Sequence, residues 1–249
     1  MVNDIQPEVE IVIGIPGKWQ TRNDIVRDIA SKSEGLLFAA MVVMDTATNE
    51  SYRLEVYDNN PHLAEAFALA GRQSLTESDI QAIQSHTFTL YLIAKGGSLE
   101  KAQEVLSVGS RLLQAGGLAV KVETTGKAHS AKDWFALTEA HNETALYHAF
   151  VTLVGDERGY YSCGMHNLGH RDALVKGSIT ADDAARLLQT FLLYALVEKP
   201  AIEDGHTFGE DQQSPRYYLR SVPCETYPTG DPFHNPYGMW ELESKHRTG

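Results

Sequence analysis

Apolar and polar residues alternate along several short stretches of the chain, which is typical of strands that bury one face. Val9, Ile11 and Ile13 follow this pattern up to the turn at Pro16 and Gly17. The same reading predicts further strands at residues 36–44, 52–56, 87–94, 118–123, 146–154, 160–165 and 217–222.

Helical periodicity appears between these strands. The clearest example is residues 98–115, where Leu99, Ala102 and Val105 share one face and Gly116 stands where a left-handed C-cap is expected. Elsewhere a Ser or Thr followed three residues later by Asp indicates a helix start. Such pairs are Thr21/Asp24, Thr76/Asp79, Ser130/Asp133 and Thr180/Asp183, and the last opens a long helix.

The second half of the chain repeats the layout of the first half at an offset of 109 residues. With this offset the strand at residues 9–13 falls on residues 118–122, Gly17 falls on Gly126, and the first helix start falls on Ser130. Strand phase, turn glycine and helix start keep register over about fifty residues. This agreement favours an internal duplication.

Each half then reads strand-helix-strand-strand-helix-strand, which is the ferredoxin-like βαββαβ pattern. We therefore predict an α+β protein of two tandem ferredoxin-like repeats with antiparallel sheets, bridged by a long helix. The first repeat covers residues 1–97, the bridging helix residues 98–115 and the second repeat residues 116–223. Residues 224–249 form an aromatic and Pro-rich tail that is expected to pack on the surface.

The two predicted repeats differ in the sheet face that their helices leave open. In the first repeat this face is largely apolar, whereas the second repeat places polar side chains at matching positions. A mostly apolar surface with a few converging polar groups is typical of a ligand pocket. Alternatively, the face meets solvent and its Lys and Glu form a surface ion pair. The predicted ligand-binding residues are Lys121, Glu123, His129, Trp134, His148, Phe150 and His166.

A second candidate site is the segment Cys163-Gly-Met-His166-Asn-Leu-Gly-His170, whose spacing resembles that of metal ligands. Cys163 falls on the predicted helix-facing side of its strand, opposite to His166, so a buried structural thiol is the simpler interpretation. Zinc or haem bound by Cys163, His166 and His170 is kept as an alternative, and no cofactor is predicted as the main interpretation.

Composition narrows the class of protein. The 249 residues carry a formal net charge of −12 and no run of five basic residues, which disfavours nucleic acid and anionic membranes as partners. The longest apolar run, residues 36–44, is too short for a membrane helix, and the acidic start lacks a signal-peptide core. Two cysteines do not make a disulfide framework. We therefore predict a soluble cytoplasmic protein.

Two motifs resemble a known family. Gly-Gly-Leu-Ala-Val-Lys-Val-Glu (116–123) with Ala128-His129-Ser130 and Trp134, then Gly-Met-His-Asn-Leu-Gly (164–169), are similar to an uncharacterised bacterial family, a domain of unknown function. This resemblance covers residues 9–240 loosely and implies no activity. By architecture alone, the predicted fold also resembles the chlorite dismutase and coproheme decarboxylase superfamily, which binds haem between sheets, but that family's haem motif has no match here.

No motif assigns a reaction, which favours a binding protein over an enzyme. We predict that the protein binds a small molecule or a protein partner at the sheet face of the second repeat. One alternative is a metal- or haem-dependent enzyme that uses the histidines of the second repeat. The other is an acidic immunity-type or scaffold protein that meets a basic partner.

Overall fold

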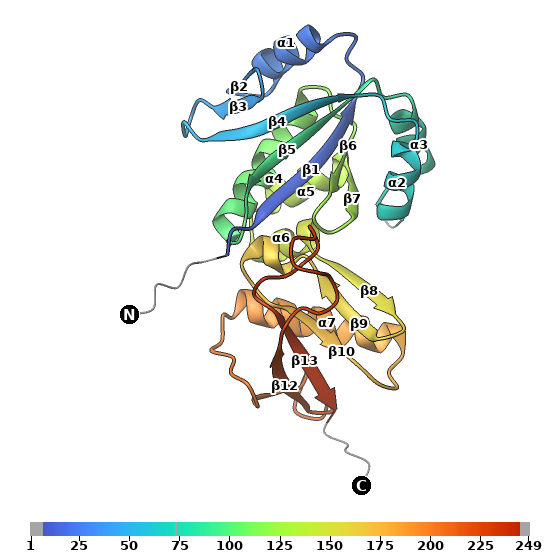
Figure 1. Cartoon of the computed structure of the whole chain (residues 1–249), viewed down its shortest axis with the longest axis vertical. Helices are drawn as coiled ribbons and strands as arrows, with labels where there is room; N and C mark the ends of the chain where they lie inside the picture. Colours follow the sequence, from blue (N-terminus) through green and yellow to red (C-terminus); the bar gives the residue numbers. More distant parts are fainter. Residues whose placement is uncertain (1–6, 73, 245–249) are drawn as a thin grey trace.

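The computed structural model describes residues 7–72 and 74–244 and has an α+β fold with two sheets, one above the other in Figure 1. All neighbouring strands of the first sheet are antiparallel, and the second sheet is antiparallel except for one pair. The predicted α+β class with largely antiparallel sheets is confirmed.

The first sheet has the strand order β2-β3-β4-β5-β1-β6-β7. Its interior strand β1 begins one residue later than predicted and buries Ile11, Ile13 and Ile15 completely, as the alternation requires. The strands are β1 (Glu10–Gly17), β2 (Leu36–Ala39), β3 (Val42–Asp45), β4 (Ser51–Asp58), β5 (Phe88–Lys95), β6 (Ala119–Val122) and β7 (Lys127–Ser130).

Helix α4 (Leu99–Gln114) covers the isoleucine face of β1, and its buried side includes Ala102, Val105 and Leu106. Gly116 follows its C-terminus with a positive φ of 115°, as predicted. The four predicted Ser or Thr N-caps each accept a hydrogen bond from the backbone of the Asp three residues on. They start α1 (Arg22–Lys32), α3 (Glu77–Gln84), α5 (Ala131–Ala140) and α7 (Ala181–Val197); α2 (Leu63–Ala70) precedes α3.

The second sheet has the strand order β11-β12-β13-β10-β9-β8, and only β10 and β13 run parallel. Helix α7 packs against β9 and β10 and buries Leu188, Phe191 and Leu192. The strands are β8 (Thr152–Asp156), β9 (Gly159–Cys163), β10 (Asp172–Val175), β11 (Thr207–Phe208), β12 (Tyr217–Val222) and β13 (Met239–Ser244).

The tandem ferredoxin-like arrangement is not confirmed. Strands β6 and β7, predicted for the second repeat, extend the first sheet, because the turn at Gly116 and Gly117 brings the chain back along the free edge of β1. The predicted strand at residues 146–154 is instead helix α6 (Glu143–Phe150) followed by β8. The offset of 109 residues therefore pairs β2 with a helix, and the two halves stop matching there.

The C-terminal residues also differ from the prediction. Residues 224–249 are predicted to lie on the surface, but β13 is an interior strand of the second sheet, between β12 and β10. Met239 and Leu242 on this strand are 2% and 1% exposed. The stretch before it, residues 223–238, runs as a loop between the two sheets (Figure 1).

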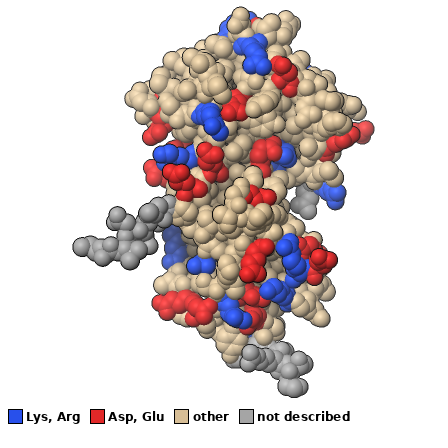
Figure 2. All heavy atoms as spheres, viewed as in Figure 1, with Lys and Arg blue, Asp and Glu red and all other residues tan. Residues whose placement is uncertain are grey.

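Charge on the face shown in Figure 2 is mixed, with Lys and Arg interspersed among Asp and Glu. Within residues 7–72 and 74–244, no helix combines the length and the apolar character needed to cross a membrane.

Candidate functional site

Two of the predicted ligand-binding residues lie together, but on the first sheet. Lys121 and Glu123 form an ion pair beside β1, on the face opposite α4. A Cβ atom added to Gly14 would lie 2.9 Å from Oε1 of Glu123, so this glycine leaves room for the carboxylate. Both charges are partly exposed and neutralise each other, as the surface-pair alternative describes.

Three other predicted residues belong to the core. The ring of Trp134 lies between those of His129 and Phe150, with centroid distances of 5.6 and 5.9 Å. Trp134 Nε1 donates to the Leu106 carbonyl at 3.0 Å, and His129 Nε2 lies 2.9 Å from the Ala149 carbonyl. Burial lowers the pKa of His129 to about 4. This cluster packs α5 against α6, and the hydrogen bonds of Trp134 and His129 go to backbone carbonyls.

His148 lies apart from these residues, on the exposed side of α6 beside the ring of Tyr147. Near it, the Lys127 ammonium donates to the carbonyls of His148 and Val151, the latter at 2.9 Å. Burial lowers the pKa of Lys127 to about 8. The lysine thus satisfies carbonyl groups that the C-terminus of a helix leaves without partners.

The metal alternative finds no ligand set. Among residues 7–72 and 74–244, no three His, Cys, Asp or Glu side chains come together as they would around a metal ion. The Cys163 thiol lies 3.9 Å from the Phe233 carbonyl, and burial raises its pKa, which makes it a structural rather than a reactive thiol. His166 and His170 line different cavities. Cys163, His166 and His170 therefore do not come together as a three-residue zinc site.

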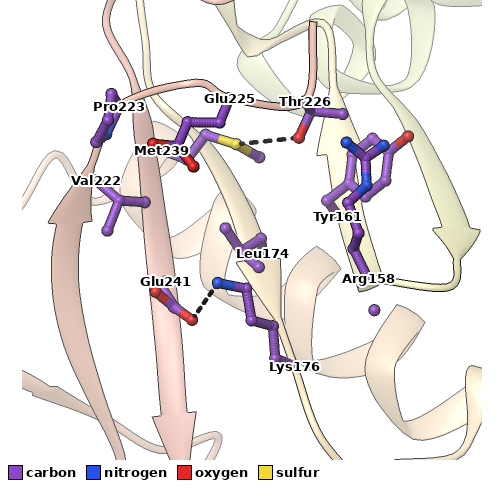
Figure 3. A pocket seen from close by; sticks show the side chains of 11 residues that line it. Arg158, Tyr161, Leu174, Lys176, Val222, Pro223, Glu225, Thr226, Met239 and Glu241 are labelled. Atoms are coloured by element: carbon purple, nitrogen blue, oxygen red, sulfur yellow. Dashed lines mark hydrogen bonds and ion pairs between the residues drawn. The ribbon is translucent and has the colours of Figure 1, made fainter.

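The open face of the second sheet, where the predicted function places a ligand, carries a shallow trough of about 390 Å³ (Figure 3). Three of its charged groups, Lys176, Glu241 and Arg158, already have partners. Lys176 is 2.9 Å from Glu241, and Arg158 pairs with Asp156 at 2.6 Å while its guanidinium lies over the ring of Tyr161. A ligand would have to break these pairs, so the trough is a weak candidate.

The Gly-Met-His-Asn-Leu-Gly motif forms the joint between the two sheets. Its middle is the short 3₁₀ helix η1 (Met165–Leu168). Gly164 has a φ of 123°, and a Cβ there would lie 2.1 Å from the Phe150 carbonyl oxygen. Gly169 has a φ of 80°, and its Cβ would lie 2.4 Å from the Gly97 carbonyl oxygen. Both glycines are needed because the turn packs directly on the backbone at the end of α6 and at Gly97.

A buried carboxylate fixes this turn to the second sheet. Asp172 is 2% exposed and accepts hydrogen bonds of 2.6 Å from Ser162 Oγ and from Asn235 Nδ2. The Met165 amide also donates to it, at 3.3 Å. Burial raises the pKa of Asp172 to about 6, against the opposing effect of these hydrogen bonds. Sequence reasoning missed this group, because Asn235 comes from the distant tail.

His166 is the most unusual polar residue of the joint. Its side chain is 2% exposed, yet neither ring nitrogen has a hydrogen-bond partner of normal geometry among the described residues. Burial, with a smaller contribution from His234, lowers its pKa to about 4, although the Pro232 carbonyl acts in the opposite direction. The ring is therefore neutral near pH 7. Buried polar atoms are rarely left without partners, so such an atom requires an explanation.

Two more buried polar atoms without partners lie in the same joint: Asn167 Nδ2 and Thr125 Oγ1. Thr124 Oγ1 donates to Asn167 Oδ1 at 3.1 Å, which links the β6–β7 turn to η1. His166 and Thr124 also line an open cavity of about 360 Å³, whose other side is formed by the tail and by the start of β1. This His166 pocket includes Glu8, Glu10, Asp231 and His234.

Comparison with known proteins identifies part of this region. A family model matches residues 161–224: domain of unknown function (DUF4261). No curated protein and no solved structure matches the chain. The resemblance to an uncharacterised domain family is thus confirmed for the part of the chain that contains the second motif, including His166 and Asp172. The match stops after β12 and leaves out β13.

The buried histidines predict acid sensitivity. The pKa values of His129 and His166 are near 4 in the folded protein, below the unperturbed 6.5, so the unfolded chain binds more protons in this window. Stability is full above pH 6.5 and falls as the pH is lowered toward 4, by about 3 kcal/mol per histidine. Asp172, whose pKa is raised from 3.8 to about 6, gains stability on protonation and offsets roughly one histidine.

Urea unfolding at pH 7, 5.5 and 4.5 measures the net change in the free energy of unfolding that the histidines and Asp172 produce together. We expect a net loss of about 3 kcal/mol by pH 4.5, and a steeper loss in Asp172→Asn, which lacks the offsetting carboxyl group. The Asp45 carboxylate, paired with Arg111 at 2.6 Å, has a lowered pKa and loses its contribution only below about pH 3.8, outside this window. A free energy of unfolding that is constant from pH 7 to 4.5 would contradict the assignment.

Proposed function

We propose that the protein binds a small cationic molecule, an amine or a guanidinium compound, in the His166 pocket. The observation that carries this proposal is the imidazole of His166, which is almost fully buried at the wall of a cavity, where neither ring nitrogen makes a hydrogen bond of normal geometry with a described residue. A neutral imidazole offers one donor and one acceptor, and a bound N–H group can supply the missing partner of the acceptor.

The charge of the cavity favours a cation. Glu8, Glu10 and Asp231 line it, no Lys or Arg does, and no described basic side chain forms an ion pair with these three carboxylates. Asp231 Oδ1 already accepts from the Phe233 amide at 2.8 Å, which orients this carboxylate while its other oxygen stays available. An ammonium or guanidinium group matches both the carboxylates and the imidazole lone pair.

The pocket replaces the predicted sheet face as the site of binding. It retains His166 from the predicted set and takes its other walls from the β6–β7 turn and the tail. A small molecule remains the proposed partner, and a cytoplasmic location remains a prediction. No observation in the described residues favours the enzyme or the acidic scaffold over this interpretation.

The test is a binding panel measured by thermal shift and calorimetry. The cations are 1,4-diaminobutane, agmatine and arginine, and the matched uncharged controls are 1,4-butanediol and 1-butanol. A ligand at a hundred times its Kd stabilises by about 2.7 kcal/mol, which is a readily measured shift in Tm. We expect a response to at least one cation and none to the controls.

His166→Leu should weaken this binding roughly tenfold or more, since a hydrogen bond between a charged and a neutral group is removed. His148→Leu is the control, because it removes an imidazole that is exposed and lines a different cavity. Ring signals of His166 should also shift on titration. The proposal fails if no cation binds, or if His166→Leu and His148→Leu bind a cation equally well.

A further inference from the structure

A second cavity, of about 710 Å³, borders the same turn and differs from the His166 pocket in charge. It lies between the C-terminal end of α7 and the segment that leads into β13. Arg171, His170 and Lys199 line it, and none of its lining residues is Asp or Glu. An all-basic cavity is unexpected in a chain with a net charge of −12.

Arg171 is held in place without a charged partner. Its guanidinium lies over the ring of Trp240 at 5.1 Å, in a cation–π contact. Gly238, with a φ of 83°, leaves room for it, because a Cβ there would lie 2.8 Å from Nη1 of the arginine. No described side chain forms an ion pair or a hydrogen bond with this guanidinium. Its position is therefore fixed while its N–H donors remain free.

Of the other two basic groups, Lys199 adds positive charge, and His170 adds an imidazole that can gain a proton when an anion binds. Lys199 lies 3.2 Å from Glu143, but its side chain is 57% exposed and that of Glu143 36%, so solvent weakens this pair. His170 is half-buried, and burial followed by the charge of Lys199 lowers its pKa. An anion bound beside these groups would reverse that shift by favouring the protonated imidazole.

The remaining wall is apolar. Met165, Phe191 and Leu192 line the cavity, together with the ring of Tyr237. Such a surface accommodates a hydrophobic body next to a charged end, and the planar fork of arginine matches two oxygens of a carboxylate or a phosphate.

We propose that this cavity binds a small organic anion, a carboxylate or phosphate attached to an apolar ring, with Arg171 as the residue that holds the charged group. This site is separate from the His166 pocket and does not depend on the cation proposed there. The turn that contains η1 would then border two ligand sites, the His166 pocket for a cation and the Arg171 cavity for an anion.

Binding is tested by calorimetry with phenyl phosphate and benzoate, and with benzyl alcohol as the uncharged analogue. We expect the two anions to bind and the alcohol to bind at least tenfold more weakly. Tryptophan fluorescence provides a local readout, because Trp240 is partly exposed whereas Trp19 and Trp134 are 3% and 0% exposed. Iodide, itself an anion, should therefore quench a Trp240 component that phenyl phosphate protects.

Arg171→Gln should weaken anion binding tenfold or more and remove the protection from iodide, since charged hydrogen bonds of this kind are strong. Arg171→Lys keeps the charge but not the fork and should give an intermediate loss, which separates binding from a folding defect. Arg158→Gln is the control, on the other face of the second sheet. In wild type, phenyl phosphate should raise the pKa of His170, measured by NMR.

Equal anion affinity in Arg171→Gln and Arg158→Gln would overturn the proposal. So would benzyl alcohol binding as tightly as benzoate, or the absence of anion binding to wild-type protein at millimolar concentration. Retained affinity in Arg171→Lys together with retained affinity in Arg171→Gln would likewise exclude Arg171 as the anchor.

Discussion

A chain that ends at residue 224 is expected to lose the second sheet. This truncation removes β13, which pairs with β12 along residues 239–244 and with β10 along residues 239–242. Two strands would then expose unpaired backbone along their full length, and the buried side chains of Met239 and Leu242 would be missing from the core. The carboxylate of Asp172 would also lose its bond from Asn235.

Hydrogen exchange read by mass spectrometry measures this directly. We expect amides of residues 152–222 to lose most of their protection, whereas the first sheet, whose strands all precede residue 131, keeps its own. A chain ending at Ser244 is the control, since it retains all of β13. Normal protection of β9, β10 and β12 in the shorter chain would refute the role given to β13, and it would show that the second sheet forms without the residues after 224.

Local patterns predicted the local structure well. The alternation at residues 9–13 and 52–56 identified β1 and β4, and the faces assigned to their side chains agree with burial. The paired Ser or Thr and Asp residues identified the starts of four helices, because capping depends only on residues within one turn. The same is true of Gly116, whose left-handed backbone is a local requirement of the helix end.

The pairing of strands within the sheets could not be predicted from local patterns. Alternation shows that residues 118–122 form a strand, but not that β6 pairs with β1 of the first sheet. The apolar run at residues 146–150 suits a buried strand and a buried helix equally, and the Asn142 cap decides for the helix. The tail was not predicted to contain a strand because it is rich in prolines and aromatic residues. Strand β13 is stabilised by pairing with β10 and β12, and β10 is far away in the sequence.

For the candidate sites too, the sequence predicted local features but not the contacts between distant segments. His166 was among the predicted ligand-binding residues, yet its unpaired nitrogens depend on the packing of the β6–β7 turn and the tail around η1. His129, Trp134 and Phe150 were assigned to the same site, but their rings pack edge to face against one another in the core. No sequence motif marks Arg171, because the feature that makes it a candidate is the lack of an ionic partner among the residues that the structure describes.

The glycine at the start of the joint should be the most sensitive single position there. In Gly164→Ala the new methyl group would lie 2.1 Å from the Phe150 carbonyl oxygen, and the backbone would have to keep a φ of 123°. We expect a loss of about 4 kcal/mol or more in the free energy of unfolding, since a backbone clash adds to conformational strain.

Gly177→Ala separates these two effects. Gly177 also has a positive φ, 98°, but a Cβ there meets no atom within 4 Å, so only the conformational strain of about 1–2 kcal/mol remains. The difference between the two variants, measured by urea unfolding at pH 7, reports the close approach of the turn to α6. Equal losses would show that the backbone of the turn shifts easily to relieve the clash. A turn that shifts so easily could not hold the His166 imidazole unpaired at the wall of its pocket.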